Sequence, residues 1–140
     1  MYNIGMTKFF DKYEHRLNII VPIIDGIVFM ILSCITIQSS IWFDESYSAY
    51  LTRGSFSDIW NLTSIDVHPP LFYFVLKIWS SIFGTDDCAM RFMSVFFGMI
   101  AIVFIFHLVR RLFGVRAASL STMLLSVTPV FIRFGQEMRM

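Results

Sequence analysis

The sequence predicts an all-α integral membrane protein with about three transmembrane helices and with interfacial helices in its first external loop. Its 140 residues are 56% hydrophobic and 17% aromatic, whereas only 15% are charged. This composition is too apolar for an ordinary soluble domain. Long apolar runs alternate with polar stretches, so we expect the runs to lie in lipid. The formal net charge of +1 gives no indication of a nucleic-acid partner.

The limits of the apolar runs define the expected elements. We expect a cytoplasmic basic leader at residues 1–18, a transmembrane helix at 19–43, an extracytoplasmic loop at 44–91, transmembrane helices at 92–109 and 117–134 joined by a cytoplasmic turn at 110–116, and the start of a second external loop at 135–140. The chain ends inside a polar stretch directly after a membrane segment. We therefore expect it to be the N-terminal part of a larger protein.

The first transmembrane helix follows a leader that contains Lys8, Lys12 and Arg16. Basic residues beside a membrane segment favour the cytoplasmic side, which predicts a cytoplasmic N-terminus. Residues 19–43 are almost continuously apolar. At about 1.5 Å per residue they are long enough to cross a hydrocarbon core of about 30 Å.

Residues 69–83 are apolar but short for a transmembrane helix. Two prolines at their start suit a first helical turn, and Tyr73, Lys77 and Trp79 suit a helix that lies in the membrane interface. If this helix lies flat, the arginine-rich turn at 110–116 returns to the cytoplasm, as the positive-inside rule favours. Three polar clusters then share the outer face, namely Asp44-Glu45, Asp66-Val-His68 and Gln136-Glu-Met-Arg139.

The acidic pair Asp44-Glu45 follows Trp42 and Phe43, two aromatic residues that suit the membrane interface. Both carboxylates would stand where a membrane-held substrate presents its head group. A carboxylate in this position can act as a general base towards an attacking hydroxyl. The alternative is structural, with Asp44 as the N-cap of a short helix and Glu45 as a solvated acid.

The segment Asp66-Val-His-Pro-Pro70 is stiff, because each proline restricts its own φ and the conformation of the residue before it. His68 would be able to donate a hydrogen bond to a phosphate oxygen. Asp66 would orient that imidazole or bind a divalent metal ion. The alternative is a turn that only starts the next helix.

Arg133, Gln136 and Glu137 have the spacing i, i+3, i+4. A helix that continues past the membrane would present them on one face, with Arg139 close to Gln136. An arginine there would bind a lipid phosphate through two hydrogen bonds. Alternatively, the arginine and glutamate side chains only snorkel or pair with each other.

One acidic residue, Asp25, lies inside an apolar run. Acids within membrane segments are functional candidates by default. Asp25 is only about two helical turns from the predicted cytoplasmic end, where it can reach water or the basic leader. This position favours a structural role.

Six short motifs follow one another along the chain. They are Trp42-Phe-Asp-Glu45, Asp66-Val-His-Pro-Pro-Leu71, Phe83-Gly84, Arg91, the Arg-Arg-Leu-Phe-Gly turn at 110–114, and Gln136-Glu-Met-Arg139. In this order they resemble the N-terminal region of the GT-C glycosyltransferases, in the branch of protein O-mannosyltransferases and of aminoarabinose and lipopolysaccharide-core transferases. The resemblance implies that Asp44 acts as base towards the acceptor and that Glu45 contacts the acceptor or a metal ion. It implies His68 near the donor phosphate.

The same resemblance places Glu137 and Arg139 near the active-site cavity and implies helices that lie on the membrane. The implied reaction transfers a sugar from a polyprenyl-phosphate-sugar donor to an acceptor at the extracytoplasmic face of the plasma membrane, by a single displacement with inversion. Arg139, His68 and Arg133 are the candidates for binding the departing lipid phosphate. The acceptor is a lipid, a glycan or a protein, and the sequence leaves open the sugar and any need for a divalent metal ion. The alternative from another class is a noncatalytic multi-pass protein, such as a transporter piece or an assembly subunit.

Overall fold

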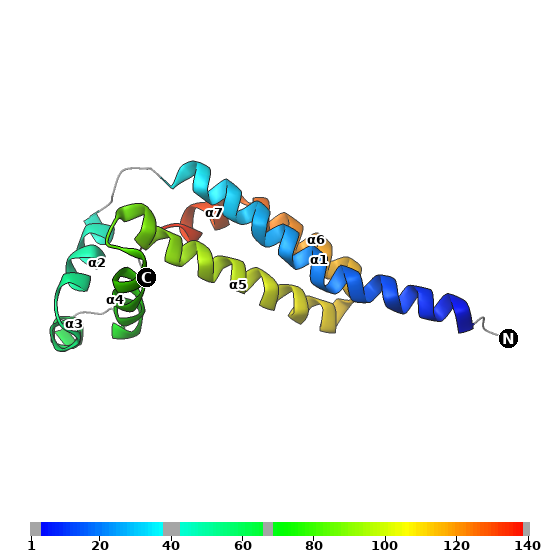
Figure 1. The fold of residues 1–140 in the computed structure, drawn as a ribbon, viewed down its shortest axis with the longest axis horizontal. Coiled ribbons are helices and arrows are strands. Elements are labelled where there is room, and N and C mark those ends of the chain that lie inside the picture. The colour runs from blue at the N-terminus through cyan, green and yellow to red at the C-terminus, as the bar shows by residue number, and fades with distance from the viewer. Residues whose placement is uncertain (1–3, 38–42, 66–68, 139–140) are drawn as a thin grey trace. The chain divides into compact units, whose positions relative to one another are not determined.

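The computed structural model describes residues 4–37, 43–65 and 69–138, with side chains described from residue 16 onward. This part of the chain consists of α-helices and short connections, with no β-strand in it. The helices are α1 (Ile4–Thr36), α2 (Phe43–Arg53), α3 (Phe56–Ile65), α4 (Pro70–Phe83), α5 (Asp87–Phe113), α6 (Val115–Val127) and α7 (Pro129–Gly135) (Figure 1). The predicted all-α fold class is confirmed.

Within the described part, two helical segments are long and apolar enough to cross a membrane by themselves, Arg16–Thr36 of α1 and Asp87–Phe113 of α5. The helices α6 and α7 meet the same criterion only as a pair, with a bend of 65° between them. If this pair is one broken span, the total reaches three. The expected integral membrane protein is therefore confirmed.

The first predicted transmembrane helix, 19–43, differs from the structure at its C-terminal end. Helix α1 begins at Ile4, inside the predicted leader, and ends at Thr36. Phe43 already begins α2, so Asp44 lies in the first turn of that helix and is not its N-cap. Gln38, Ser39 and Ser40 follow the end of α1 in the sequence, and these uncharged polar residues mark the boundary that the prediction placed at Phe43.

The predicted cytoplasmic turn at 110–116 is also shorter than expected. Arg110 and Arg111 lie in the last turn of α5, and α6 begins at Val115. The break is confined to Gly114, which has a φ of +87°. Because glycine adopts positive φ without a steric penalty, one residue is enough to separate the two helices.

The predicted helix at 117–134 is interrupted in the structure. Thr128 is extended, with φ −69° and ψ 121°, and Pro129 then begins α7. Proline disfavours helical geometry in the preceding residue, which explains the break. Pro22, in contrast, lies within α1 without ending it.

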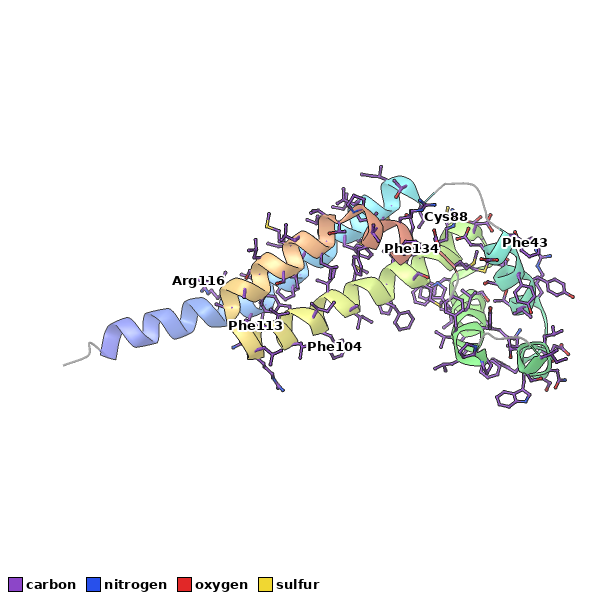
Figure 2. All side chains as sticks on the ribbon, turned by 180° about the vertical axis from the view of Figure 1, so that it is seen from behind. Phe43, Cys88, Phe104, Phe113, Arg116 and Phe134 are labelled. Carbon is purple, nitrogen blue, oxygen red and sulfur yellow. The ribbon has the colours of Figure 1, made fainter. Side chains whose placement is uncertain are left out.

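The chain folds as two compact units, one of residues 1–32 and 97–132 and one of residues 33–96 and 133–140. In the first unit, the buried ring of Phe29 packs against Phe131 with 4.7 Å between centroids. Gly98 admits this ring, because a Cβ atom there would lie 2.6 Å from the Phe29 Cε1 atom. Large side chains such as Phe104 and Phe113 point outward and are exposed, as expected of surfaces that face lipid (Figure 2).

The second unit contains α2, α3 and α4, which pack against one another around Leu51, Ile59 and Tyr73. A second apolar cluster joins Leu76 of α4 to the first turns of α5 through Met90 and Met93, and it includes Met138. These clusters bury one face of α4 and leave Leu71, Ile78 and Ile82 of the same helix exposed. Helix α4 is thus amphipathic, and its position in the membrane interface stays a prediction.

Two side chains that were expected to anchor α4 in the interface have other surroundings. Tyr73 is only 2% exposed and belongs to the apolar cluster. Lys77 donates hydrogen bonds to the carbonyl oxygens of Thr52 and Gly54, at 3.0 and 2.5 Å. Its ammonium group therefore holds the end of α2 and the connection to α3, where carbonyl groups lack helical partners.

Candidate active site

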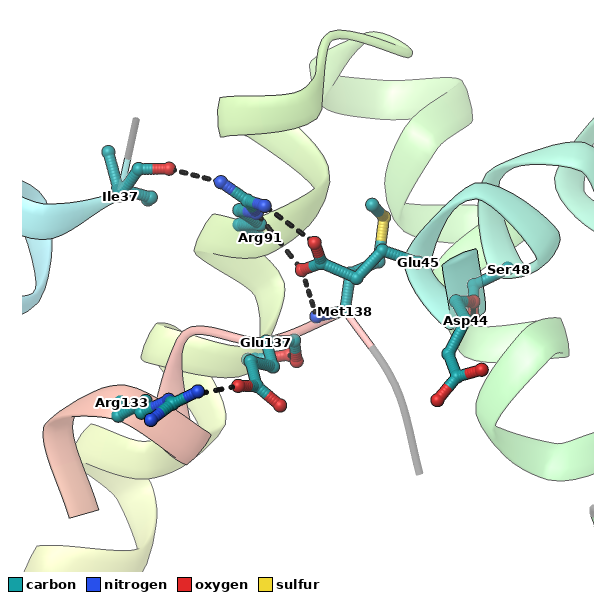
Figure 3. A network of polar contacts seen from close by, with 9 residues as sticks. Ile37, Asp44, Glu45, Ser48, Arg91, Arg133, Glu137 and Met138 are labelled. Atoms are coloured by element: carbon teal, nitrogen blue, oxygen red, sulfur yellow. Dashed lines mark hydrogen bonds and ion pairs between the residues drawn. The ribbon is translucent and has the colours of Figure 1, made fainter. Parts of the chain in front are cut away.

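A buried ion pair between Arg91 and Glu45 lies at the centre of the polar residues of the second unit. Arg91 is near the start of α5 and is 3% exposed, and Glu45 is in the first turn of α2 and is 1% exposed. The Nε atom of Arg91 lies 3.0 Å from Oε1 of Glu45, and Nη2 lies 2.5 Å from Oε2 (Figure 3). This is the two-point geometry in which a guanidinium binds a carboxylate most strongly.

Both partners make further hydrogen bonds to the backbone. Nη1 of Arg91 donates to the carbonyl oxygen of Ile37, just after α1. The backbone N–H of Met138 donates to Oε1 of Glu45 at 3.0 Å. The pair therefore joins four segments of the second unit, namely the end of α1, α2, α5 and the residues after α7. Burial of two charges is tolerated here because their remaining hydrogen-bonding groups are also satisfied.

Asp44 precedes Glu45 in the first turn of α2, and its side chain is exposed. Successive helical residues project about 100° apart, since the helix has about 3.6 residues per turn. Figure 3 shows the Asp44 carboxylate extending away from the Arg91–Glu45 pair. The backbone carbonyl of Asp44 accepts a hydrogen bond from the Ser48 hydroxyl at 3.0 Å. The first turn of α2 is thus held firmly, and it presents one buried and one exposed carboxylate.

The residues after the third predicted span do not continue as a helix, contrary to the expectation for Gln136 and Glu137. Helix α7 ends at Gly135. Gln136 is buried and its Oε1 atom accepts a hydrogen bond from the Thr36 hydroxyl at 3.0 Å, while the backbone carbonyl of Glu137 accepts one from Ser94. These two contacts redirect the chain towards the ends of α1 and α5, which explains the helix end.

Arg133 and Glu137 nevertheless meet, with 3.7 Å between Nε and Oε1. The Arg133 side chain is 65% exposed, whereas that of Glu137 is 15% exposed. An exposed pair of this length contributes little stability. The contact agrees with the alternative in which the arginine and glutamate side chains pair with each other. It leaves much of the Arg133 side chain accessible.

Three predicted site residues, Asp66, His68 and Arg139, lie outside the described residues, and their roles stay predictions. Among the side chains that the structure describes, no three His, Cys, Asp or Glu residues are grouped as metal ligands. Since the predicted ligand Asp66 is not among them, binding of a divalent metal ion also stays a prediction.

Arg91 is one of the six short motifs in the sequence, but no role was predicted for it. A signal was present, because Arg91 directly precedes the apolar stretch 92–109. A charged residue at the start of such a stretch requires a partner when it is buried. The partner, Glu45, is 46 residues away and could not be identified by spacing.

The comparison with protein-family models matches residues 67–140 to the dolichyl-phosphate-mannose-protein mannosyltransferase family. No curated protein and no solved structure matches the chain. The matched region contains Arg91, Arg133 and Glu137, while Asp44 and Glu45 precede it. The match covers more than half of the chain and confirms the resemblance found in the sequence. The chain therefore belongs to the dolichyl-phosphate-mannose-protein mannosyltransferase family and is a membrane glycosyltransferase of the GT-C type.

Proposed function

We propose that this glycosyltransferase moves a sugar from a polyprenyl-phosphate-sugar donor to an acceptor hydroxyl and that Asp44 is the base. The observation that carries the proposal is the Arg91–Glu45 pair, which fixes the first turn of α2 and leaves the adjacent Asp44 carboxylate exposed. A base must be both accessible and held in one place. Asp44 meets both requirements.

Glu45 has a different role in this proposal. Its Oε1 atom accepts hydrogen bonds from Arg91 and Met138, and its Oε2 atom accepts one from Arg91. Its carboxylate is therefore engaged within the protein and is not arranged to receive a proton from substrate. Glu45 and Arg91 act as positioning residues for Asp44.

In the proposed step, the acceptor oxygen forms a bond to the anomeric carbon while the bond from that carbon to the phosphate oxygen breaks. Asp44 takes the proton of the attacking hydroxyl, and the lipid phosphate leaves with the bonding electron pair. A single displacement of this kind inverts the configuration at the anomeric carbon. Cationic groups near the phosphate lower the barrier, because negative charge grows on the leaving group in the transition state.

Arg133 is the described candidate for contact with the lipid phosphate. It belongs to α7, part of the bent span, and its side chain is largely exposed although it touches Glu137. The family name, which includes a dolichyl-phosphate sugar, supports a lipid-phosphate donor. His68 and Arg139 complete the proposed phosphate-binding set, with Asp66 to orient His68. The acceptor is a lipid, a glycan or a protein.

The proposed orientation places α2, α3 and α4 on the extracytoplasmic side of the plasma membrane. Arg110, Arg111 and Arg116 flank the connection between α5 and α6. By the positive-inside rule this connection is cytoplasmic, and the opposite end of α5, which carries Arg91, is then extracytoplasmic.

The test is transfer of radiolabelled sugar from polyprenyl-phosphate donors in membranes that contain the full-length protein. Asp44→Asn should lower transfer at least about a hundredfold, the usual contribution of a general base. Asp58→Asn is the matched control, because it makes the same chemical change at another exposed aspartate of the second unit. Normal transfer by Asp44→Asn would remove Asp44 from the mechanism. Absence of transfer by the unchanged protein with every polyprenyl-phosphate donor would contradict the donor class.

A further inference from the structure

A groove lies between α1 and the first half of α6, within the first unit. Its volume is about 470 Å³, in the range of pockets that hold small molecules. Leu17, Val21 and Ile24 line it from α1, and Arg116, Leu120 and Met123 line it from α6. In each set the residues are separated by three or four positions, so each helix contributes one continuous face.

The cationic end of the groove coincides with the ends of two membrane-crossing elements. Leu17 is the second residue of the candidate span Arg16–Thr36. Arg116 is the second residue of α6, where the bent span begins. In a bilayer crossed by these two elements, the groove would start at the level of the lipid head groups and continue along apolar side chains towards the hydrocarbon core.

The described charges of the first unit are mainly positive. Within residues 16–32 and 97–132, they are Arg16, Asp25, Arg110, Arg111 and Arg116. All four arginine side chains are exposed (Arg116 is labelled in Figure 2). Asp25 also lines the groove, but it is buried and its Oδ2 atom accepts a hydrogen bond from the Thr122 hydroxyl at 2.6 Å. The acid is thus engaged with α6, whereas the arginines face outward.

We propose that this groove binds one anionic phospholipid of the surrounding bilayer. The phosphate group lies against Arg116, and an acyl chain follows Val21, Ile24, Leu120 and Met123. Basic pockets between membrane helices are suited to anionic head groups, and exposed apolar side chains in the membrane are suited to acyl chains. Because the described charges are mainly positive, the groove should prefer a phospholipid with a net negative charge over the zwitterionic lipids of the bilayer.

Native mass spectrometry of the full-length protein in detergent, with added phosphatidylglycerol or phosphatidylcholine, tests the proposal. We expect phosphatidylglycerol to be retained preferentially. Arg116→Gln should reduce this preference about fivefold, the effect of one arginine near a membrane surface, whereas Arg116→Lys should preserve it. Arg53→Gln removes one positive charge outside the groove and should also preserve it.

A second variant separates the groove from general surface electrostatics. Leu120→Trp should fill the apolar lining and lower retention of phosphatidylglycerol without changing the net charge. Equal retention of the two phospholipids by the unchanged protein would overturn the proposal, as would unaltered retention by both Arg116→Gln and Leu120→Trp. Displacement of phosphatidylglycerol by equimolar polyprenyl phosphate would assign the groove to the carrier of the sugar donor, and it would overturn the phospholipid assignment.

Discussion

Arg91 binds Glu45 through two hydrogen bonds, although the residues are 46 positions apart in the sequence. Both side chains are removed from water, so neither charge has solvent as an alternative partner. The pair connects α5 to the first turn of α2 and, through Met138, to the segment after α7. The pair thereby fixes the position of Asp44, which precedes Glu45 in the first turn of α2.

Removal of one partner should therefore be costly. Arg91→Met would leave the Glu45 carboxylate buried without its counter-ion, and we expect it to lower the free energy of unfolding by about 3–5 kcal/mol. The double variant Arg91→Met with Glu45→Leu should recover part of this loss, since it removes both charges. Denaturant unfolding in detergent micelles measures both effects. A loss below about 1 kcal/mol for the single variant would show that the pair behaves like an exposed salt bridge.

The two adjacent carboxylates should respond differently to amide substitution. The amide of asparagine cannot take a proton, so Asp44→Asn should lower kcat by at least about a hundredfold, the usual contribution of a general base. Glu45→Gln should lower kcat less, because it weakens the support of Asp44 without removing the base. Sugar transfer at saturating donor measures both variants. A larger loss of kcat in Glu45→Gln than in Asp44→Asn would contradict these two roles.

The start of α3 should depend on pH. The Asp58 carboxylate accepts hydrogen bonds from the Ser55 hydroxyl and the Ser55 backbone N–H, both at 2.7 Å. These bonds, with a smaller contribution from Lys77, hold the pKa of Asp58 below its ordinary value of 3.8. A lowered pKa stabilises the folded state above pH 3.8, and this stabilisation is lost as the pH falls through the lower, folded-state value.

Hydrogen exchange of the α3 backbone amides measures this effect. Exchange, corrected for its intrinsic pH dependence, should be faster below the folded-state pKa of Asp58 than near pH 6. In Ser55→Ala the amides should be less protected near pH 6, and the difference between the two conditions should shrink, because the capping hydroxyl is missing. Equal protection of α3 in both proteins at every pH would contradict the proposed cap.

Two glycines in the first unit should differ in their tolerance of alanine. A Cβ atom at Gly98 would lie 2.6 Å from the ring of Phe29, which is fully buried. Gly98→Ala should therefore lower stability by about 1–3 kcal/mol, the usual cost of overpacking. Gly26→Ala is the control, because its Cβ atom would meet Met99 at an ordinary contact distance of 3.9 Å. Thermal unfolding of the two variants should separate them clearly, and equal melting temperatures would contradict the close packing at Gly98.

Local chemistry explains which parts of the fold were predictable. Apolar composition indicated membrane helices, and the prolines at 69 and 70 indicated the start of α4. The break at Pro129 and the role of Gly114 also follow from backbone preferences of single residues. The end of α1 at Thr36 comes just before the polar residues Gln38, Ser39 and Ser40, whereas the prediction extended the span past them to the apolar residues 41–43.

The amino-acid sequence by itself determined the all-α membrane class, most helix positions and the family, because hydrophobicity and backbone preferences act over a few residues. The tertiary structure decided which polar groups are buried and which remain accessible. Glu45 and Asp44 are neighbours with the same charge, yet Glu45 is buried against Arg91 and Asp44 is exposed. That difference depends on how α2 and α5 pack, and such packing joins residues whose separation along the chain carries no local signal.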